Sequence, residues 1–230
     1  MPDPVPPSPL PNPLARNAHW RLGQLLASNI FALWLQMRAR GFENLPKDSG
    51  ALLLINHQSY LDPLLVGMPL RRPVSYLARD SLFRVPVVGW WLRNTYVMPI
   101  NREAASTASL REAIRRLQHG LYVGIFPEGT RTLDGSVGPF KPGFLALLRR
   151  ADVPVIPVGV AGAFEAMPRG TPFPRPGKVR IVFGPPLSRE TLASFPKSDE
   201  TGLLEYVRSR VIACQQDANQ WRAGGRESPR

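Results

Sequence analysis

Short runs of apolar residues recur through the middle of the chain and are separated by polar or glycine-containing turns. The first run, residues 51–55, contains only apolar residues and follows Ser49-Gly50. An apolar run of this length without alternation is typical of a strand buried on both faces. Further runs of the same kind predict strands at residues 74–78, 95–100, 121–126, 154–160 and 179–183.

Between several of these runs, apolar residues recur every three or four positions, which is the period of an amphipathic helix. The clearest helix is predicted over residues 106–119, with Gly120 directly after it as a stop signal. Others are predicted at 63–68, where Pro63 suits the first helical position, and at 199–218. Strands that alternate with helices predict one α/β domain, whose largely parallel or mixed sheet is flanked by helices and carries its active groups at the strand ends.

A helical pattern also covers residues 17–40, and residues 22–37 contain no charge. Sixteen helical residues reach about 24 Å, which is too short for the roughly 30 Å hydrocarbon core of a bilayer. Arg21 begins a narrow polar strip on this helix, and a wide apolar arc lies opposite. With Trp20 and Trp34, this pattern favours a helix that lies in the membrane interface. The alternative is a core helix packed on its own domain.

These patterns divide the chain into four segments. Residues 1–16 are rich in proline and predict a disordered tail, followed by the interface helix at 17–40. Residues 41–220 form the predicted α/β domain, and residues 221–230 a flexible tail. The start of the chain lacks both a basic stretch and an apolar run, so no secretory signal is expected.

Composition adds a strong positive charge to this picture. The formal net charge is +12, and 25 of the 29 basic residues are arginine. Arginine suits phosphate groups, which favours phospholipid head groups, phosphorylated substrates or nucleic acid as partners, although codon usage in a GC-rich genome would also replace lysine with arginine. The single cysteine, Cys214, lies on the apolar face of a predicted helix, so a core position in a reducing compartment is expected.

The first predicted strand ends in a histidine, and an aspartate follows five residues later. On one helix His57 and Asp62 would point about 140° apart, whereas a turn between strand and helix can bring them together. His57 would then be a general base whose ring is oriented by the Asp62 carboxylate. The alternative is that Asp62 only caps its helix and His57 is an ordinary turn residue.

The predicted strand at 121–126 runs into a second polar turn, Glu128-Gly129-Thr130-Arg131. Gly129 allows a close backbone approach, Thr130 offers a hydroxyl, and Arg131 can grip a phosphate with two hydrogen bonds. Glu128 would repel a phosphate, so we expect a basic neighbour to neutralise it or a substrate hydroxyl to face it. An exposed surface turn is the alternative. The spacing of a nucleotide-binding P-loop occurs here, but the required Lys-Ser/Thr is missing, so nucleotide binding is not expected.

Together these motifs make the sequence similar to the glycerolipid acyltransferases typified by bacterial 1-acylglycerol-3-phosphate acyltransferase. Asn-His-Gln-Ser-Tyr-Leu-Asp at 56–62 resembles that family's His-x4-Asp block, and residues 126–131 resemble its third block. Residues 84–91 through 99–102 and residues 153–158 resemble the second and fourth blocks, and Phe-Lys-Pro-Gly at 140–143 a further signature.

The resemblance implies transfer of a fatty acyl group from acyl-CoA or acyl carrier protein to the free sn-2 hydroxyl of 1-acylglycerol-3-phosphate, giving phosphatidic acid. His57 and Asp62 would be catalytic, and no cofactor is expected beyond the thioester co-substrate. The implied acceptor site comprises Arg79 and the turn Glu128, Gly129, Thr130 and Arg131. Acyl-site or structural roles are implied for Gly89, Arg102 and Lys141. The scattered histidines have no zinc-ligand spacing, so no metal is expected.

A lipid acceptor and a basic surface imply a membrane-associated enzyme, monotopic or peripheral, on the cytoplasmic face of the inner or plasma membrane. Its partners would be anionic bilayer lipid and the acyl donor, with no nucleic acid. Other lysophospholipids or lyso-aminolipids stay open as acceptors, as do the donor, the acyl length, the oxyanion donors and the oligomeric state. Two other classes are remote alternatives. One is a serine hydrolase using Ser59, for which the sequence lacks a Gly-x-Ser-x-Gly elbow, and the other is a non-enzymatic basic membrane-binding module.

Overall fold

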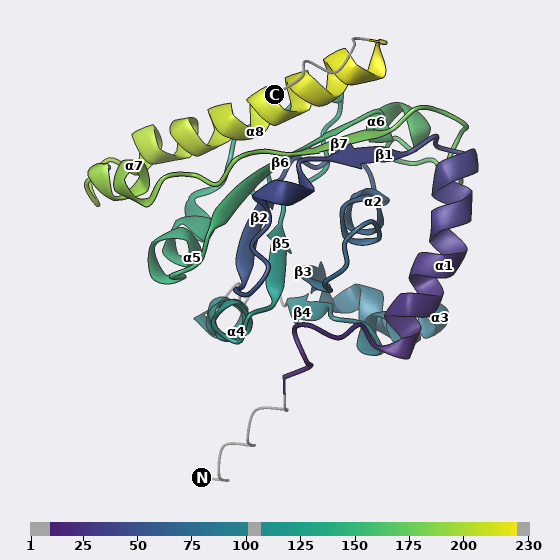
Figure 1. Cartoon of the computed structure of the whole chain (residues 1–230), viewed down its shortest axis with the longest axis horizontal. Coiled ribbons are helices and arrows are strands. Elements are labelled where there is room, and N and C mark those ends of the chain that lie inside the picture. The colour runs from purple at the N-terminus through teal and green to yellow at the C-terminus, as the bar shows by residue number, and fades with distance from the viewer. Residues whose placement is uncertain (1–9, 101–106, 225–230) are drawn as a thin grey trace, which may run out of the picture.

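The computed structural model describes residues 10–100 and 107–224, and within them the strands form one seven-stranded sheet (Figure 1). Its order is β1-β7-β6-β2-β5-β3-β4. Neighbouring strands are parallel except β6 and β7, which are antiparallel. The predicted α/β fold with a largely parallel, mixed sheet is therefore confirmed. The strands are β1 (Arg38–Arg40), β2 (Ala51–Ile55), β3 (Val74–Arg79), β4 (Met98–Ile100), β5 (Tyr122–Ile125), β6 (Val155–Ala161) and β7 (Arg180–Phe183).

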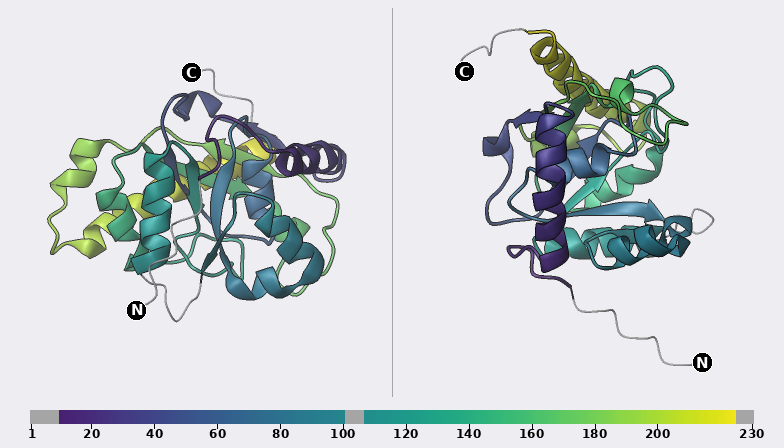
Figure 2. Two further views of the ribbon diagram at one scale, coloured as in Figure 1. Left: turned by 90° about the horizontal axis from the view of Figure 1, so that it is seen from below. Right: turned by 90° about the vertical axis from the view of Figure 1, so that its right-hand side faces the viewer.

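Helices cover both faces of the sheet. The α-helices are α1 (Ala18–Leu33), α2 (Asp62–Gly67), α3 (Pro86–Arg93), α4 (Thr107–Gln118), α5 (Leu145–Arg150), α6 (Ala163–Ala166), α7 (Arg189–Ser194) and α8 (Glu200–Arg222). The described residues also form the short 3-10 helices η1 (Phe42–Asn44), η2 (Asp80–Arg84) and η3 (Pro142–Phe144). Figure 2 shows α1 on one side of the sheet and α8 on the other.

The central strand β2 explains how one apolar run serves two hydrophobic cores. Leu53 and Ile55 belong to the core beneath α1 and α2. Leu52 and Leu54 belong to the core beneath α4, α5 and α8. Because successive side chains of a strand point to opposite faces, a strand between two helical layers needs apolar residues at every position. The unbroken run at 51–55 is the sequence signature of this central place.

The predicted helix at 17–40 is wrong over its last part. Helix α1 ends at Leu33, and Gln36 has a left-handed backbone with φ of 39°. Residues 38–40 then form β1, which pairs with β7. The apolar pattern continues past Leu33 because Leu35 and Met37 pack against the same core as the helix, so periodicity alone could not locate the break.

Helix α1 packs on its own domain, as the alternative interpretation expected, and it also exposes apolar side chains. Trp20 and Phe31 are buried in the core. Leu25, Leu26 and Leu33 are 65%, 59% and 82% exposed, and they lie on its outer side. Within residues 10–100 and 107–224, no helix is both long and apolar enough to cross a membrane.

Parts of the two segments predicted to be disordered or flexible tails are ordered within the described residues. In the first, the carbonyl of Pro13 accepts from Arg72 Nε at 3.3 Å and that of Ala15 accepts from the Tyr96 hydroxyl at 2.9 Å. These contacts hold residues 13–15 against the domain. In the second, α8 runs on to Arg222, past the predicted end at 218. The remainder of both tails, 1–9 and 225–230, lies outside the described residues.

Helix α8 approaches β6 at a position where only glycine fits. A Cβ atom built on Gly159 would come within 2.2 Å of the backbone carbon of Cys214 and the nitrogen of Gln215. Overpacking typically costs about 1–3 kcal/mol. We expect Gly159→Ala to lower the free energy of unfolding by more than this, because the added methyl group meets backbone atoms. Chemical denaturation measures this, with Gly177→Ala as the control, because nothing lies within 4 Å of a Cβ there. Equal losses in both variants would contradict the close approach.

The same contact gives stability a dependence on pH through Cys214. Burial raises the pKa of this thiol from 9.0 to about 11. Below pH 9 the thiol is protonated in both folded and unfolded chains, so its contribution is fully present. As the pH rises from about 9 to 11, the unfolded chain loses the proton first, and the free energy of unfolding should fall by about 2–3 kcal/mol. Cys214→Ala should lack this part of the fall, so an identical pH profile in that variant would contradict the assignment.

Candidate active site

The carboxyl ends of β2 and β5 bring the two polar turns together. The strands are parallel neighbours in register, with Leu54 opposite Ile125. The turns that follow are joined by backbone contacts, since Thr132 N donates to the carbonyl of His57 at 2.8 Å. Side chains separated by about seventy positions in the sequence therefore share one edge of the sheet, as parallel strands require.

His57 and Asp62 are in contact, as the spacing suggested. Nδ1 of His57 lies 2.8 Å from Oδ2 of Asp62. The same carboxylate oxygen accepts from the backbone N–H groups of Gln58 and Ser59, each at 2.7 Å. Asp62 thus closes the turn that carries the histidine, and no side-chain capping bond to α2 is present at this described helix start. The interpretation of Asp62 as only a helix cap does not fit these contacts.

Asp62 is fully buried, whereas the His57 side chain keeps 18% of its surface exposed. Burial raises the pKa of the Asp62 carboxyl above its ordinary value, and the hydrogen bonds from His57, Ser59 and Gln58 oppose that rise. An ionised Asp62 can accept from Nδ1–H of the imidazole, which leaves Nε2 as the basic atom on the exposed side. The pair can therefore take a proton from a hydroxyl group.

An aromatic stack supports the ring of His57. The ring of Phe126 stacks on it, with centroids 4.2 Å apart and an angle of 26° between the ring planes. Tyr76 continues the stack at 6.1 Å from Phe126. Gly124 makes room, because a Cβ there would fall 2.4 Å from the Tyr76 ring. Sequence reasoning missed this support, and its only signal was that Phe126 ends one predicted strand while Tyr76 lies within another.

Glu128 has a different position from the one expected. Its side chain is buried, and its two oxygens accept from the backbone N–H groups of His57 at 2.7 Å and Gly138 at 2.9 Å. Burial raises the pKa of this carboxyl above its ordinary value, against the opposing effect of those two hydrogen bonds. The expectation of a neutralising basic side chain or a substrate hydroxyl is thus corrected, since Glu128 positions the backbone of His57.

The rest of this turn combines two exposed residues, Gly129 and Thr130, with the half-buried cation Arg131. The guanidinium carbon of Arg131 lies 3.4 Å from the centroid of the Tyr60 ring. Gly129 has a φ of +67°, and a Cβ there would lie 3.1–3.3 Å from the side chain of Lys141. Thr130 is exposed next to them. Arg131 and Lys141 therefore flank the turn with positive charge, so this surface can hold an anion.

The remaining candidate residues are Gly89, Arg79 and Arg102. Gly89 is buried in α3, where a Cβ would fall 2.1 Å from the carbonyl oxygen of Phe83, so close packing requires glycine there. Arg79 is the last residue of β3, and β3 neighbours β5 in the sheet. Arg102 lies outside the described residues. In the part of the chain that is described, no group of three or more His, Cys, Asp or Glu side chains could hold a metal ion.

Two residues that flank His57 were not singled out from the sequence. Asn56 exchanges two hydrogen bonds with the backbone of Val160, at 3.0 and 2.7 Å. Gln58 donates to the carbonyl of Gly135 at 2.8 Å and accepts from the backbone of Ala163 at 3.2 Å. Both side chains are buried, so they fix the turn to β6 and α6. Buried amides on both sides of a histidine were the signal that could have identified them.

A His-Asp pair and a cationic turn at the carboxyl edge of a mostly parallel sheet describe a site for acid-base chemistry on an anionic substrate. The chain belongs to the acyltransferase family, because the profile of that family, described as Acyltransferase, matches residues 36–161, more than half of the chain. The family resemblance inferred from the motifs is therefore confirmed.

Several relatives carry the name 1-acyl-sn-glycerol-3-phosphate acyltransferase. A chloroplast protein of Brassica napus is 31% identical over 75% of this chain, and the matched part is 51% of its own length. The chain thus spans about half the length of that relative. A Bacillus subtilis protein is 29% identical, with 74% of this chain and 83% of that protein covered. The crystal structure of the 1-acyl-sn-glycerophosphate acyltransferase PlsC from Thermotoga maritima is similar with a TM-score of 0.73 and 29% identity, over 91% of this chain and 81% of that one.

The position of Glu128 gives a prediction about stability. In Glu128→Gln, the amide NH₂ group cannot accept the backbone N–H that one carboxylate oxygen accepts now, so a buried donor loses its partner. We expect the free energy of unfolding to fall by about 1–3 kcal/mol in urea denaturation. Glu43→Gln, at an exposed glutamate, is the matched control and should change little. Unchanged stability in Glu128→Gln would contradict the positioning role.

Proposed function

We propose that this chain transfers a fatty acyl group from acyl-CoA or acyl carrier protein to the sn-2 hydroxyl of 1-acylglycerol-3-phosphate, giving phosphatidic acid. The observation that carries the proposal is the contact between Nδ1 of His57 and the buried carboxylate of Asp62, 2.8 Å long, beside a cationic turn. The names of the relatives from Brassica napus and Bacillus subtilis support the same acceptor.

In the proposed reaction, Nε2 of His57 takes the proton of the acceptor hydroxyl as its oxygen attacks the thioester carbonyl carbon. Asp62 stabilises the imidazolium that forms. The carbon–sulfur bond then breaks, and the proton on His57 passes to the departing thiolate. The products are an oxygen ester and a free thiol, so the reaction needs neither a covalent acyl-enzyme nor an added reactant.

The acceptor phosphate would bind at the turn that carries Arg131. Arg131 is held over the ring of Tyr60, and the Lys141 side chain lies beside Gly129. A planar guanidinium can donate two parallel hydrogen bonds to a phosphate, and the lysine adds a second charge. Arg79, at the end of the neighbouring strand β3, is proposed as a further contact.

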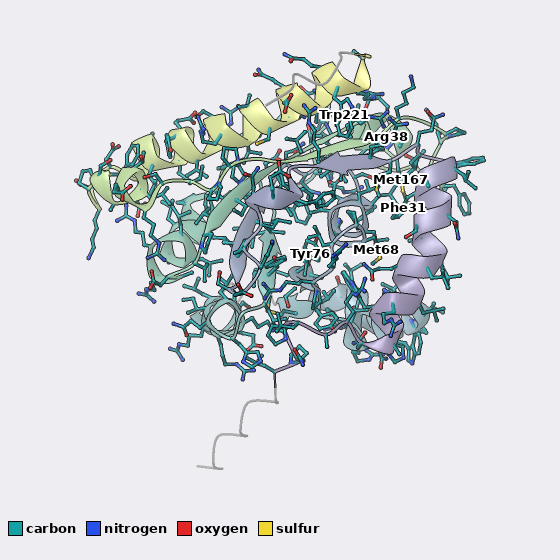
Figure 3. All side chains as sticks on the ribbon, viewed as in Figure 1. Phe31, Arg38, Met68, Tyr76, Met167 and Trp221 are labelled. Atoms are coloured by element: carbon teal, nitrogen blue, oxygen red, sulfur yellow. The ribbon has the colours of Figure 1, made fainter. Side chains whose placement is uncertain are left out.

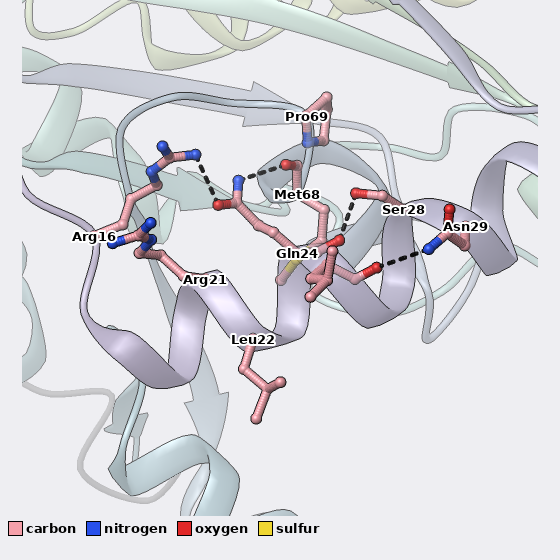
Figure 4. A pocket seen from close by; sticks show the side chains of 9 residues that line it. Arg16, Arg21, Leu22, Gln24, Ser28, Asn29, Met68 and Pro69 are labelled. Carbon is pink, nitrogen blue, oxygen red and sulfur yellow. Dashed lines mark hydrogen bonds between the residues drawn. The ribbon is translucent and has the colours of Figure 1, made fainter.

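We also propose that α1 docks the enzyme on the membrane surface, where acceptor and product reside. Its outer side exposes Leu22, Leu25 and Leu26. Figure 4 shows residues that line a groove beside this helix, with Arg16 and Arg21 toward one end and Met68 and Pro69 also in the lining. Apolar side chains bordered by arginine suit an interface rich in anionic lipid.

The first experiment follows acyl transfer by purified protein in lipid, with lysophosphatidic acid and either acyl-CoA or acyl carrier protein as donor, and detects phosphatidic acid by mass spectrometry. We expect His57→Ala to lower kcat by about 10²–10⁴-fold, the contribution of a positioned base. His119→Ala is the control, since this exposed histidine directly follows α4, away from the site.

Wild-type turnover that is lost only in His57→Ala would support the proposal. No product from lysophosphatidic acid with either donor would refute that acceptor, and a panel of other lysophospholipids and lyso-aminolipids would then identify a different one. Full activity of His57→Ala would refute the mechanism.

A further inference from the structure

A second group of cations gathers where β1, β7 and the end of α8 meet. Arg38 and Arg180 are direct partners in the register of β1 and β7, so their side chains leave the sheet on the same face. The side chains of Arg40 and Arg180 both stack on Trp221 of α8. Figure 3 labels Arg38 and Trp221 at this corner of the molecule. We call the set Arg38, Arg40, Lys178, Arg180 and Arg222 the edge cluster.

Acidic residues neutralise only part of the edge cluster. Arg40 pairs with Asp217 at 2.6 Å, and Arg222 pairs with Glu165. Among the described residues no ion pair involves Arg38, Lys178 or Arg180. Two nearby carboxylates against five cations leave an excess of three positive charges in this corner.

Arg180 is the least solvated member of the cluster. It is 8% exposed, and Nη1 donates to the carbonyls of Gln36 at 2.6 Å and Val179 at 2.9 Å. Its Nε is buried, with no hydrogen-bond acceptor in the described part of the chain. Burial lowers the pKa of Arg180, and the charges of Arg38 and Arg222 lower it further. Like charges directly opposite each other on neighbouring strands are unfavourable, so this arrangement costs stability unless an anion joins it.

A hollow beside the cluster offers room for such an anion. It is lined by Lys178, Asn219, Arg222 and Ala223, so cationic side chains and an amide face it. The last turn of α8 also attracts positive charge through its free carbonyl groups. That attraction can account for Arg222, which belongs to this turn, but it gives no reason for two arginines to face each other across β1 and β7.

The edge cluster lies at the same edge of the sheet as His57. Arg180 is paired with Ala161 at the carboxyl end of β6, and β6 neighbours β2. A short series of contacts connects the two places, because Gln58 accepts from the backbone of Ala163. The preceding residue, Gly162, approaches the carbonyl of Lys178 so closely that a Cβ would fall 2.1 Å from it.

The cluster faces away from the apolar side of α1. Ala39 and Ile181 point to the core that α1 covers. Their neighbours Arg38, Arg40 and Arg180 point to the opposite face, where Trp221 and α8 lie. If α1 rests on the bilayer, the cluster faces water. A ligand that arrives from solution suits this place better than a lipid head group of the same membrane.

We infer that the edge cluster binds the phosphate-bearing end of the acyl donor, the end of the pantetheine arm farthest from the thioester. The inference rests on the proposed function and locates the donor in it. Both coenzyme A and the prosthetic group of acyl carrier protein carry phosphate at that end, and a long arm joins it to the reacting carbonyl. The donor would then lie along the carboxyl edge of β6, with its thioester at His57 and its phosphate at Arg38, Lys178 and Arg180.

The test compares wild type with the double variant Arg38→Gln/Lys178→Gln. Both side chains are exposed, and removing Arg38 relieves repulsion, so we expect no loss of thermal stability. Arg111→Gln/Arg150→Gln removes two exposed cations from α4 and α5 and is the matched control. We expect the double variant to raise KM for the donor about tenfold, the effect of losing a charge-assisted contact, without changing kcat or KM for lysophosphatidic acid.

Binding without turnover separates this inference from the proposed function. Calorimetry with coenzyme A as the probe should show about tenfold weaker binding to the double variant than to wild type or the control. Pantetheine, which lacks phosphate, should bind all three alike. If wild type transfers no acyl group to lysophosphatidic acid, the proposed function fails, and the calorimetric comparison still decides whether the cluster binds this phosphate.

Each other result has a defined meaning. A rise in KM for acyl-CoA alone, or for acyl carrier protein alone, supports the inference and identifies the donor. An unchanged KM for the donor together with an unchanged affinity for coenzyme A would overturn it. The edge cluster would then only interact with the carboxyl end of α8. A raised KM for lysophosphatidic acid instead, or loss of binding only to phosphatidylglycerol vesicles, would also overturn it, in favour of the acceptor phosphate or a lipid head group.

Discussion

Two buried carboxylates hold the turn on which the candidate chemistry depends. Asp62 accepts hydrogen bonds from the ring of His57 and from two backbone N–H groups that follow it. Glu128 reaches across from the end of β5 and accepts the backbone N–H of His57 itself. Burying a carboxylate costs free energy unless it is well hydrogen bonded. Each of these carboxylates therefore holds its hydrogen-bond donors, and with them the turn, in one position. The imidazole is thereby oriented through both its ring and its backbone.

This arrangement explains why the fold places the site at a strand end. Neighbouring parallel strands deliver their following turns to one edge, so the turn after β2 meets the turn after β5 without a long connection. The strands themselves are buried on both faces, which makes the edge rigid. Gly124 lets Tyr76 and Phe126 stack behind the histidine. A flexible loop would not hold an imidazole and a carboxylate at hydrogen-bonding distance with comparable accuracy.

The sequence predicted what depends on local pattern and missed what depends on packing. The run at 51–55 identified β2 at its observed bounds, and the five-residue spacing identified the contact between His57 and Asp62. The break after Leu33 was missed, because Leu35 and Met37 continue the apolar period while packing on the same core. The role of Glu128 could not be predicted, since its partner Gly138 is ten residues away in a loop without a periodic pattern.

The two charged regions of the molecule follow from the same sheet geometry. β6 and β7 are antiparallel, so the start of β7 returns to the carboxyl edge and brings Arg180 level with Ala161. β1 then adds Arg38 to the same row. The repulsion between unneutralised arginines next to Trp221 lowers the stability of the free protein. A bound anion would attract these arginines and make the net electrostatic energy of the row favourable. Helices α1 and α8 lie on opposite faces of the sheet. The apolar surface of α1, which suits lipid, and the cationic surface beside α8, which suits a soluble anion, can therefore both lie next to the carboxyl edge that carries His57.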